Sequence, residues 1–274
     1  MKHRRSILAL ALIAACGEAD PLAGVDPFGA YQDEHVTVIG GDTTVPIASG
    51  DLSSKGCLQV TTSTCVPVKR EGKYCKASSG PVDAVLIGGM VAEVICYADE
   101  VQKDPALVID ADGDGDIDIP QNANGSVITF DPSSDGKAVV GDVTLDANNV
   151  TLYGNGPDRS IIKGNLRITG NNARVRGIRV QGNVDIELNT GALVLSVVEG
   201  NLTIRSNNTL VAETAVFGNF TVTGNNSVLV GDGTAGQWSI GGSGASCERN
   251  YRFQDADSDK VVDPSERGDA LSCR

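Results

Sequence analysis

Apolar and polar positions alternate in short runs along the second half of the chain, and these runs recur at a fixed interval. Each run opens with a glycine and carries apolar residues at its third and fifth positions, as in Gly200-Asn201-Leu202-Thr203-Ile204. The same pattern begins at Gly164, Gly182, Gly218 and Gly236, so neighbouring runs lie 18 residues apart. Alternation of this kind predicts strands with one buried face.

Two further apolar columns recur at the same interval. They consist of Leu152, Val175, Leu193, Val211 and Leu229, and of Ile162, Val180, Val198 and Val216. Three short strands per turn, stacked at a fixed period, are typical of a β-solenoid, because one coil cannot bury its apolar face alone. We therefore predict an all-β fold, a single-stranded parallel β-helix over 125–241. Its first coil, from Gly141, is five residues longer, and the surplus falls in the turn-forming stretch Gly154 to Asp158.

Asparagine forms columns of its own. They consist of Asn148, Asn171, Asn189, Asn207 and Asn225, and of Asn165, Asn183, Asn201 and Asn219. Such columns predict side-chain ladders at tight turns, with solvated turn residues as the alternative. One coil also separates Arg167 from Asp185, and Glu187 from Arg205, which predicts mildly favourable surface ion pairs.

The stretch from Asn149 to Ile162, NVTLYGNGPDRSII, resembles the opening coil of pectin-lyase-like right-handed β-helix proteins. The resemblance covers roughly Ser126 to Ile240 and implies a right-handed coil. An 18-residue coil would also suit a left-handed hexapeptide helix, but glycine does not recur every six residues and Arg174 would then point inward. Members of the group include polysaccharide lyases and hydrolases but also binding and structural proteins, so the fold alone assigns no activity.

The chain begins with basic residues, followed by an apolar run that ends at Ala15 and is too short to span a bilayer. Leu12-Ile13-Ala14-Ala15-Cys16 resembles the bacterial lipobox, which implies lipidation of Cys16. We expect a signal peptide over 1–15, a lipidated tether over 16–50, and a lipid-anchored protein on the bacterial cell surface, at the outer membrane. An ordinary signal peptide with an incidental cysteine is the alternative.

The net charge of −13 argues against nucleic acid as a partner, because phosphate binding needs a basic face. His35 is the only histidine after the signal peptide, which argues against Ser-His-Asp or Cys-His catalysis. Six further cysteines in an exported chain predict disulfides, with a zinc site as the weaker alternative. They are Cys57, Cys65, Cys75, Cys96, Cys247 and Cys273. The first four lie in a segment, 51–106, that we interpret as a small disulfide-rich cap at the N-terminal end of the solenoid.

Five carboxylates crowd into nine residues of the segment 107–124. They belong to Asp110, Asp112, Asp114, Asp116 and Asp118. With Gly115 at the sixth position, the pattern resembles the EF-hand-type calcium loop, as also used in dockerins and thrombospondin type 3 repeats. The departure is Gln121 at the twelfth position, where a bidentate Glu is expected.

A second acidic loop lies in the C-terminal segment 242–274, between Cys247 and Cys273, whose disulfide would staple this tail. The resemblance to the calcium loop implies as ligands Asp255, Asp257, Asp259, the carbonyl of Val261, Asp263 and Glu266. The departures are Lys260 at the sixth position, where glycine is usual, and Pro264, which argues against a regular exiting helix. We expect Ca²⁺ in both loops; the alternative is a pair of solvated acidic linkers.

Two functions agree with these features. The first is a non-enzymatic, calcium-stabilised surface scaffold or adhesin that binds a glycan or a surface protein with the flank of the solenoid, and we favour it. The second is a carbohydrate-active enzyme resembling pectate lyases, which use calcium and an arginine base. Its basic candidates are Arg167, Arg174, Arg176 and Arg179. Against it, the acidic loops lie outside the repeats, and the coils lack the long loops that build a cleft.

Overall fold

The structure is a computed structural model that describes residues 36–39, 57–59, 65–67, 82–87, 90–96, 107–110, 117, 123–130 and 138–273. In these ranges the regular secondary structure consists of β-strands and one 3-10 turn, η2 (Pro264–Glu266). No helix in the described ranges is both long and apolar enough to cross a membrane. The signal peptide, Cys16 and the tether over 16–50 lie outside these ranges, apart from Val36–Ile39, and stay predictions.

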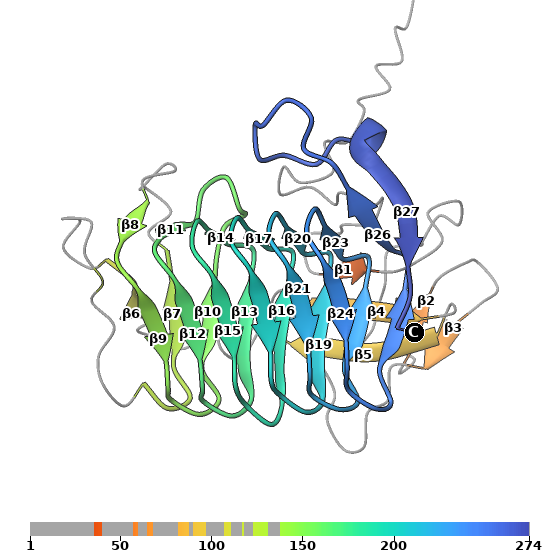
Figure 1. The fold of residues 1–274 in the computed structure, drawn as a ribbon. Coiled ribbons are helices and arrows are strands. Elements are labelled where there is room, and N and C mark those ends of the chain that lie inside the picture. The colour runs from red at the N-terminus through yellow and green to blue at the C-terminus, as the bar shows by residue number, and fades with distance from the viewer. Residues whose placement is uncertain are drawn as a thin grey trace, which may run out of the picture.

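The repeats form a parallel β-solenoid with three long sheets (Figure 1). Sheet I consists of β6 (Leu107–Val108), β7 (Val127–Thr129), β10 (Thr151–Tyr153), β13 (Ala173–Arg176), β16 (Gly191–Val194), β19 (Thr209–Ala212), β22 (Val228–Val230) and β25 (Ser246–Glu248). Sheet III consists of β9 (Val143–Leu145), β12 (Leu166–Ile168), β15 (Val184–Ile186), β18 (Leu202–Ile204), β21 (Phe220–Val222) and β24 (Trp238–Ile240).

Sheet II follows sheet I in each coil. It consists of β8 (Val139–Val140), β11 (Ile161–Lys163), β14 (Arg179–Val180), β17 (Val197–Val198), β20 (Ala215–Val216), β23 (Gly233–Thr234), β26 (Asn250–Phe253) and the antiparallel β27 (Arg267–Leu271). Outside the solenoid, β1 (Val36–Ile39), β4 (Val82–Ile87) and β5 (Met90–Cys96) form a three-stranded sheet. A separate antiparallel pair joins β2 (Cys57–Gln59) and β3 (Cys65–Pro67).

The strand register confirms the interval predicted from the sequence. Leu202 of β18 pairs with Val184 of the coil before it and with Phe220 of the coil after it, both 18 residues away. The predicted apolar columns all point into the solenoid, where Leu193, Val198 and their column neighbours are fully buried. Stacking therefore gives the solenoid one continuous hydrophobic core.

The asparagine columns form the predicted ladders at two turns. In the turn between sheets II and III, the Asn165 Oδ1 atom accepts the backbone N–H of Asn183 at 2.8 Å, and the next coils repeat this contact. In the turn between sheets III and I, Asn148 Oδ1 accepts the backbone N–H of Asn171 at 2.9 Å, and later coils repeat this contact. The residue after this column, such as Asn172, adopts a positive φ value, which asparagine tolerates. The glycine column that begins the sheet III runs is required because a Cβ on Gly218 would collide with the carbonyl of Gly200.

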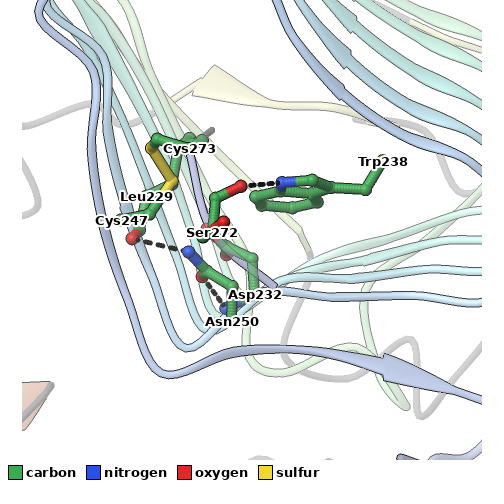
Figure 2. The surroundings of a disulfide bond; sticks show 7 residues. All are labelled: Leu229, Asp232, Trp238, Cys247, Asn250, Ser272 and Cys273. Carbon is green, nitrogen blue, oxygen red and sulfur yellow. Dashed lines mark hydrogen bonds between the residues drawn. A yellow bond between two sulfur atoms is a disulfide. The ribbon is translucent and has the colours of Figure 1, made fainter. Parts of the chain in front are cut away.

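The C-terminal tail closes the last coil of the solenoid. The disulfide predicted between Cys247 and Cys273 is present (Figure 2). The indole of Trp238 packs on Phe220 with ring centroids 4.6 Å apart and donates its N–H to the carbonyl of Ser272 at 2.8 Å. The tail therefore covers the end of the apolar column of sheet III.

Candidate metal centre in the C-terminal loop

The second acidic loop connects strands β26 and β27, which form an antiparallel hairpin at the end of sheet II (Figure 1). The hairpin packs on the solenoid through Phe253 and Val262, which cluster with Val197 and Ala215 on the outer face of sheet II. The acidic loop is thus held against a rigid flank.

Three carboxylates of the loop meet at one point. Ligand oxygens of Asp255, Asp257 and Asp259 all lie within 4.8 Å of one another. The turn is built by their own side chains, since Asp259 Oδ1 accepts the N–H of Val261 at 2.7 Å. Ser258 and Lys260 both have φ of +63°, which places side chains in the left-handed region where glycine is usual.

Asp255 has an unusual environment for a carboxylate. Its side chain is only 8% exposed. One oxygen, Oδ2, lies 2.9 Å from the ammonium group of Lys260, whereas the buried Oδ1 has no hydrogen-bond partner. A buried carboxylate oxygen without a partner is costly, so this atom marks a place where a cation would be stabilised.

Glu266 closes the loop from the other side. Its Oε1 accepts the N–H of Ala256 at 2.6 Å, and its Oε2 accepts the N–H of Asp263 at 3.1 Å. This second contact forms a capping box at the start of η2. Glu266 therefore lies at the position that the motif requires for a bidentate ligand, but its oxygens hold main-chain amides.

Lys260 is the basic member of the site. Besides its ion pair with Asp255, its ammonium group lies 4.9 Å from the ring centroid of Phe217, close enough for a cation–π contact. The sequence marked this residue as a departure from the calcium motif. The structure shows that the departure places a positive charge beside a carboxylate that a metal ion would need.

Arg179 fastens the loop to the solenoid. Its guanidinium donates to the carbonyl of Lys260 at 3.1 Å and lies 3.3 Å from the Glu199 carboxylate and 3.6 Å from that of Asp158. Sequence reasoning had counted Arg179 only among the lyase candidates. The sequence contained a hint, because Arg179 interrupts a column that is otherwise without charge: Ile161, Val197, Ala215 and Gly233.

The donor set fits Ca²⁺. It offers hard carboxylate oxygens and a main-chain carbonyl at Val261, the ligands that Ca²⁺ takes in sets of six to eight with variable geometry, whereas Mg²⁺ demands a near-ideal octahedron and usually keeps several waters. The fit is incomplete, because Lys260 and the two amides bound by Glu266 compete for three of the oxygens. Binding would require these contacts to rearrange.

The other predicted sites are less defined. Of the first acidic loop, only Asp110 and Ile117 lie in the described ranges, so its calcium site stays a prediction. The backbones of Cys57, Cys65 and Cys96 lie in strands, Cys75 is outside the described residues, and the pairing of these four stays a prediction.

The four arginines proposed for a lyase do not share one surface. Arg167 lies in sheet III, Arg174 and Arg176 in sheet I, and Arg179 in sheet II. Three sheet faces therefore separate residues that are near neighbours in sequence. Only Arg174 and Arg176 share a face, the outer one of sheet I, and the arrangement does not bring all four arginines to one substrate.

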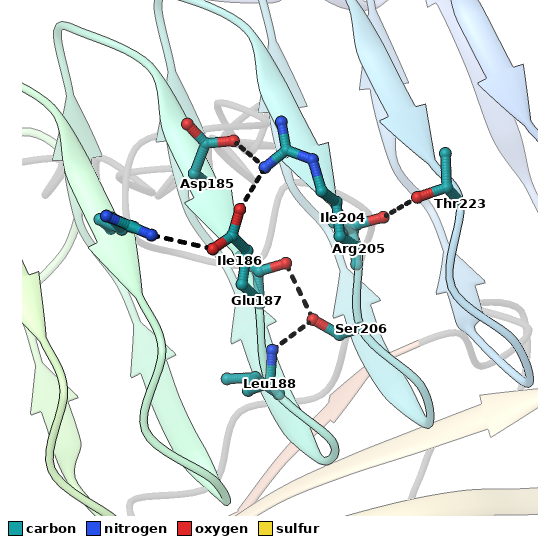
Figure 3. Close-up of polar contacts among 9 residues, drawn as sticks. Asp185, Ile186, Glu187, Leu188, Ile204, Arg205, Ser206 and Thr223 are labelled. Atoms are coloured by element: carbon teal, nitrogen blue, oxygen red, sulfur yellow. Dashed lines mark hydrogen bonds and ion pairs between the residues drawn. The ribbon is translucent and has the colours of Figure 1, made fainter.

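The predicted charge pairs lie on the outer face of sheet III (Figure 3). Arg205 binds Asp185 at 3.1 Å and Glu187 at 2.6 Å. Arg167 pairs with Glu187 at 3.0 Å and not with Asp185, which is its neighbour in register, because the longer glutamate reaches diagonally to Arg167 as well as to Arg205 in its own column. Both arginines lower the pKa of Glu187 through hydrogen bonds and charge, and the hydrogen bond with Arg167 contributes most.

One buried acid escaped the sequence analysis. Asp232 lies in the bend between sheets I and II, where its Oδ1 accepts the N–H of Thr214 at 3.0 Å, and its own N–H donates to Asn250 Oδ1 (Figure 2). Ser196, Thr214 and Asn250 occupy the same column in other coils. Burial raises the pKa of Asp232 well above its ordinary value. The 18-residue interval would have identified it as an acid in a column of neutral residues.

Comparison with known proteins gave no match: no family model fits the chain, and no curated protein and no solved structure is significantly similar to it.

Proposed function

We propose that this protein is a calcium-stabilised scaffold or adhesin, held on the bacterial cell surface by a lipid on Cys16. The observation that carries the proposal is the C-terminal loop, in which oxygens of three aspartates lie within 4.8 Å of one another and one buried oxygen of Asp255 has no hydrogen-bond partner. Ca²⁺ bound there would neutralise the carboxylates and fix the hairpin on sheet II. The Asp110–Asp118 loop would act in the same way where the chain enters the solenoid.

The flank of the solenoid supports a binding role. The outer face of sheet III carries polar and charged side chains in regular rows, among them Thr203, Thr221 and the Arg205 ion pairs. Extended, regular surfaces of this kind are what solenoid proteins use to bind partners. Hydroxyl, amide and charged groups suit a glycan or the surface of another protein. The lipid anchor would hold this flank outside the cell.

Thermal unfolding of the full chain, purified in detergent, tests the metal site. A ligand that binds only the folded protein raises the melting temperature with its concentration. We expect Ca²⁺ to raise it relative to EGTA, and Asp257→Asn to abolish most of that rise. Asp269→Asn, which removes the same charge from the exposed part of β27, is the matched control.

Two results would overturn the metal site. If neither Ca²⁺ nor EGTA changes the melting temperature, the acidic loops are solvated segments. If Asp257→Asn responds to Ca²⁺ as fully as the control, any calcium effect arises elsewhere in the chain. The anchor has its own test: Cys16→Ser should prevent incorporation of labelled fatty acid and release the protein from the membrane fraction.

A further inference from the structure

The outer face of sheet I is apolar along its middle coils. Its outward positions alternate with the buried Leu193 and Val211, and the strand register aligns them in two rows. They are Ala192, Leu210 and Val228 in one row and Val194, Ala212 and Val230 in the other. On a bare solenoid these side chains would form one contiguous apolar patch facing water, which soluble proteins rarely expose.

These outward side chains are nevertheless buried. Leu210 is 5% exposed, and Val194 and Ala212 are 0% exposed. Among the residues that the structure describes, the partly buried hydrophobic side chains packed with them are Tyr153, Leu195 and Val228, which belong to sheet I and its bend. A strand's outward side chains stand away from its own coil, so neighbours in the same sheet cannot cover them completely. Another part of the chain must lie on this face.

The C-terminal hairpin packs on sheet II and not on sheet I. Its residues Tyr251, Phe253 and Val262 pack on Val197 and Ala215, which are outward positions of sheet II. The tail beyond the hairpin ends in the disulfide and the Ser272 contact at the last coil. The segment left to cover sheet I is the part of the chain that precedes the solenoid.

We propose that the three-stranded sheet β1–β4–β5 of this same chain docks on the outer face of sheet I. Three strands need an apolar surface to pack against, and β4 and β5 are mostly aliphatic in sequence. The two charged residues within β4 and β5 are both acidic, Asp83 and Glu93, whereas sheet I presents Arg174 and Arg176. The charges are therefore complementary.

Polar and aromatic residues on the same face also have interaction partners: Thr129, Thr151, Tyr153, Arg174, Arg176 and Glu248. The docked sheet lies along the flank of the solenoid, not over its N-terminal end, where the sequence had suggested a cap. Sheets I and II are then both covered by the protein's own segments, and sheet III is the flank left for a partner. This inference does not depend on calcium.

Photo-crosslinking of the full chain tests the contact directly. Val228 lies at the half-buried margin of the apolar patch, so Val228→p-benzoylphenylalanine places a benzophenone there with little disturbance. We expect crosslinks within one chain to peptides from residues 36–96. Thr221→p-benzoylphenylalanine, on the outer face of sheet III, should give none. Crosslinks to a second chain, to another segment, or no more crosslinks than the control would overturn the docking.

Hydrogen exchange supplies an independent measurement. Ala212→Asp buries a carboxylate under the docked sheet, and we expect backbone amides of β4 and β5 to exchange at least about tenfold faster while those of β15 and β18 are unchanged. Thr221→Asp is the matched control. A folded Ala212→Asp protein with unchanged exchange in β4 and β5 would refute the proposal, and the crosslink decides the matter if this variant fails to fold.

Discussion

Sheets I and III of the solenoid have the same interior and opposite exteriors. Both present an aliphatic column to the core, with Leu193 in one and Leu202 in the other fully buried. Outside, sheet I carries Leu210 and Val194, whereas sheet III carries Thr203 and Arg205. Inward residues therefore determine the coil, and outward residues determine whether a flank is buried, as on sheet I, or exposed, as on sheet III.

The largest expected effect comes from shortening an outward side chain of sheet I. Leu210→Ala should lower the free energy of unfolding by about 2–5 kcal/mol, because a nearly buried side chain would leave a cavity. Thr203→Ala, at an exterior position of sheet III, should change it by no more than about 0.5 kcal/mol. Urea denaturation of both variants measures the difference. Equal effects would mean that the exteriors of the two sheets are equivalent.

The bend between sheets I and II should respond to pH through Asp232. Its raised pKa means that the folded protein keeps a proton that the unfolded chain releases above about 3.8, so stability falls as the pH rises beyond that value. Asp232→Asn keeps the acceptor for Thr214 without the charge. At pH 7 we expect it to stabilise the protein by about 1–3 kcal/mol, with the gain disappearing near pH 3.5.

Asn250 offers the reverse substitution one coil further along. Its Nδ2 donates to the carbonyl of Leu229 at 3.0 Å, so Asn250→Asp removes a donor and adds a buried charge (Figure 2). It should destabilise the protein at pH 7, and less so at low pH. Parallel unfolding curves of both variants between pH 3.5 and 8 check the signs, and a gain from Asp232→Asn that is independent of pH would contradict the assignment.

Periodicity predicted the interior well and the exterior poorly. The interval of 18 residues identified the buried columns, the asparagine ladders and the direction of Phe220 and Trp238, because stacking repeats one environment in every coil. Periodicity could not predict contacts between a coil of the solenoid and a segment outside the repeat. Arg179 meets Lys260, 81 residues away, and no local pattern specifies which distant loop will lie over a given column. For the same reason the burial of Leu210 could not be foreseen.

On the exterior of sheet II, Lys260 should weaken calcium binding. Its ammonium group already neutralises Asp255 at 2.9 Å and would have to be displaced by the ion. Lys260→Gln should therefore bind Ca²⁺ about three- to tenfold more tightly, which corresponds to roughly 1 kcal/mol for an ion pair of this kind. Isothermal titration of the full chain measures it. Lys163→Gln, with the same loss of charge at an exposed position of β11, controls for the overall field, and equal affinities in the two variants would rule out competition by Lys260.

The smallest effect belongs to the ion pairs of sheet III. Arg205→Gln removes both contacts to Asp185 and Glu187, yet exposed pairs contribute little, so the melting temperature should fall by no more than about 2 °C at pH 7. Because the arginines lower the pKa of Glu187, their stabilisation is present above the ordinary pKa of that carboxyl and is lost as the pH falls through the lowered value. The difference from wild type should accordingly vanish at low pH and in 1 M salt. A larger or salt-insensitive loss would show that this flank is held by more than solvated charges, and that the two exteriors differ less than their side chains indicate.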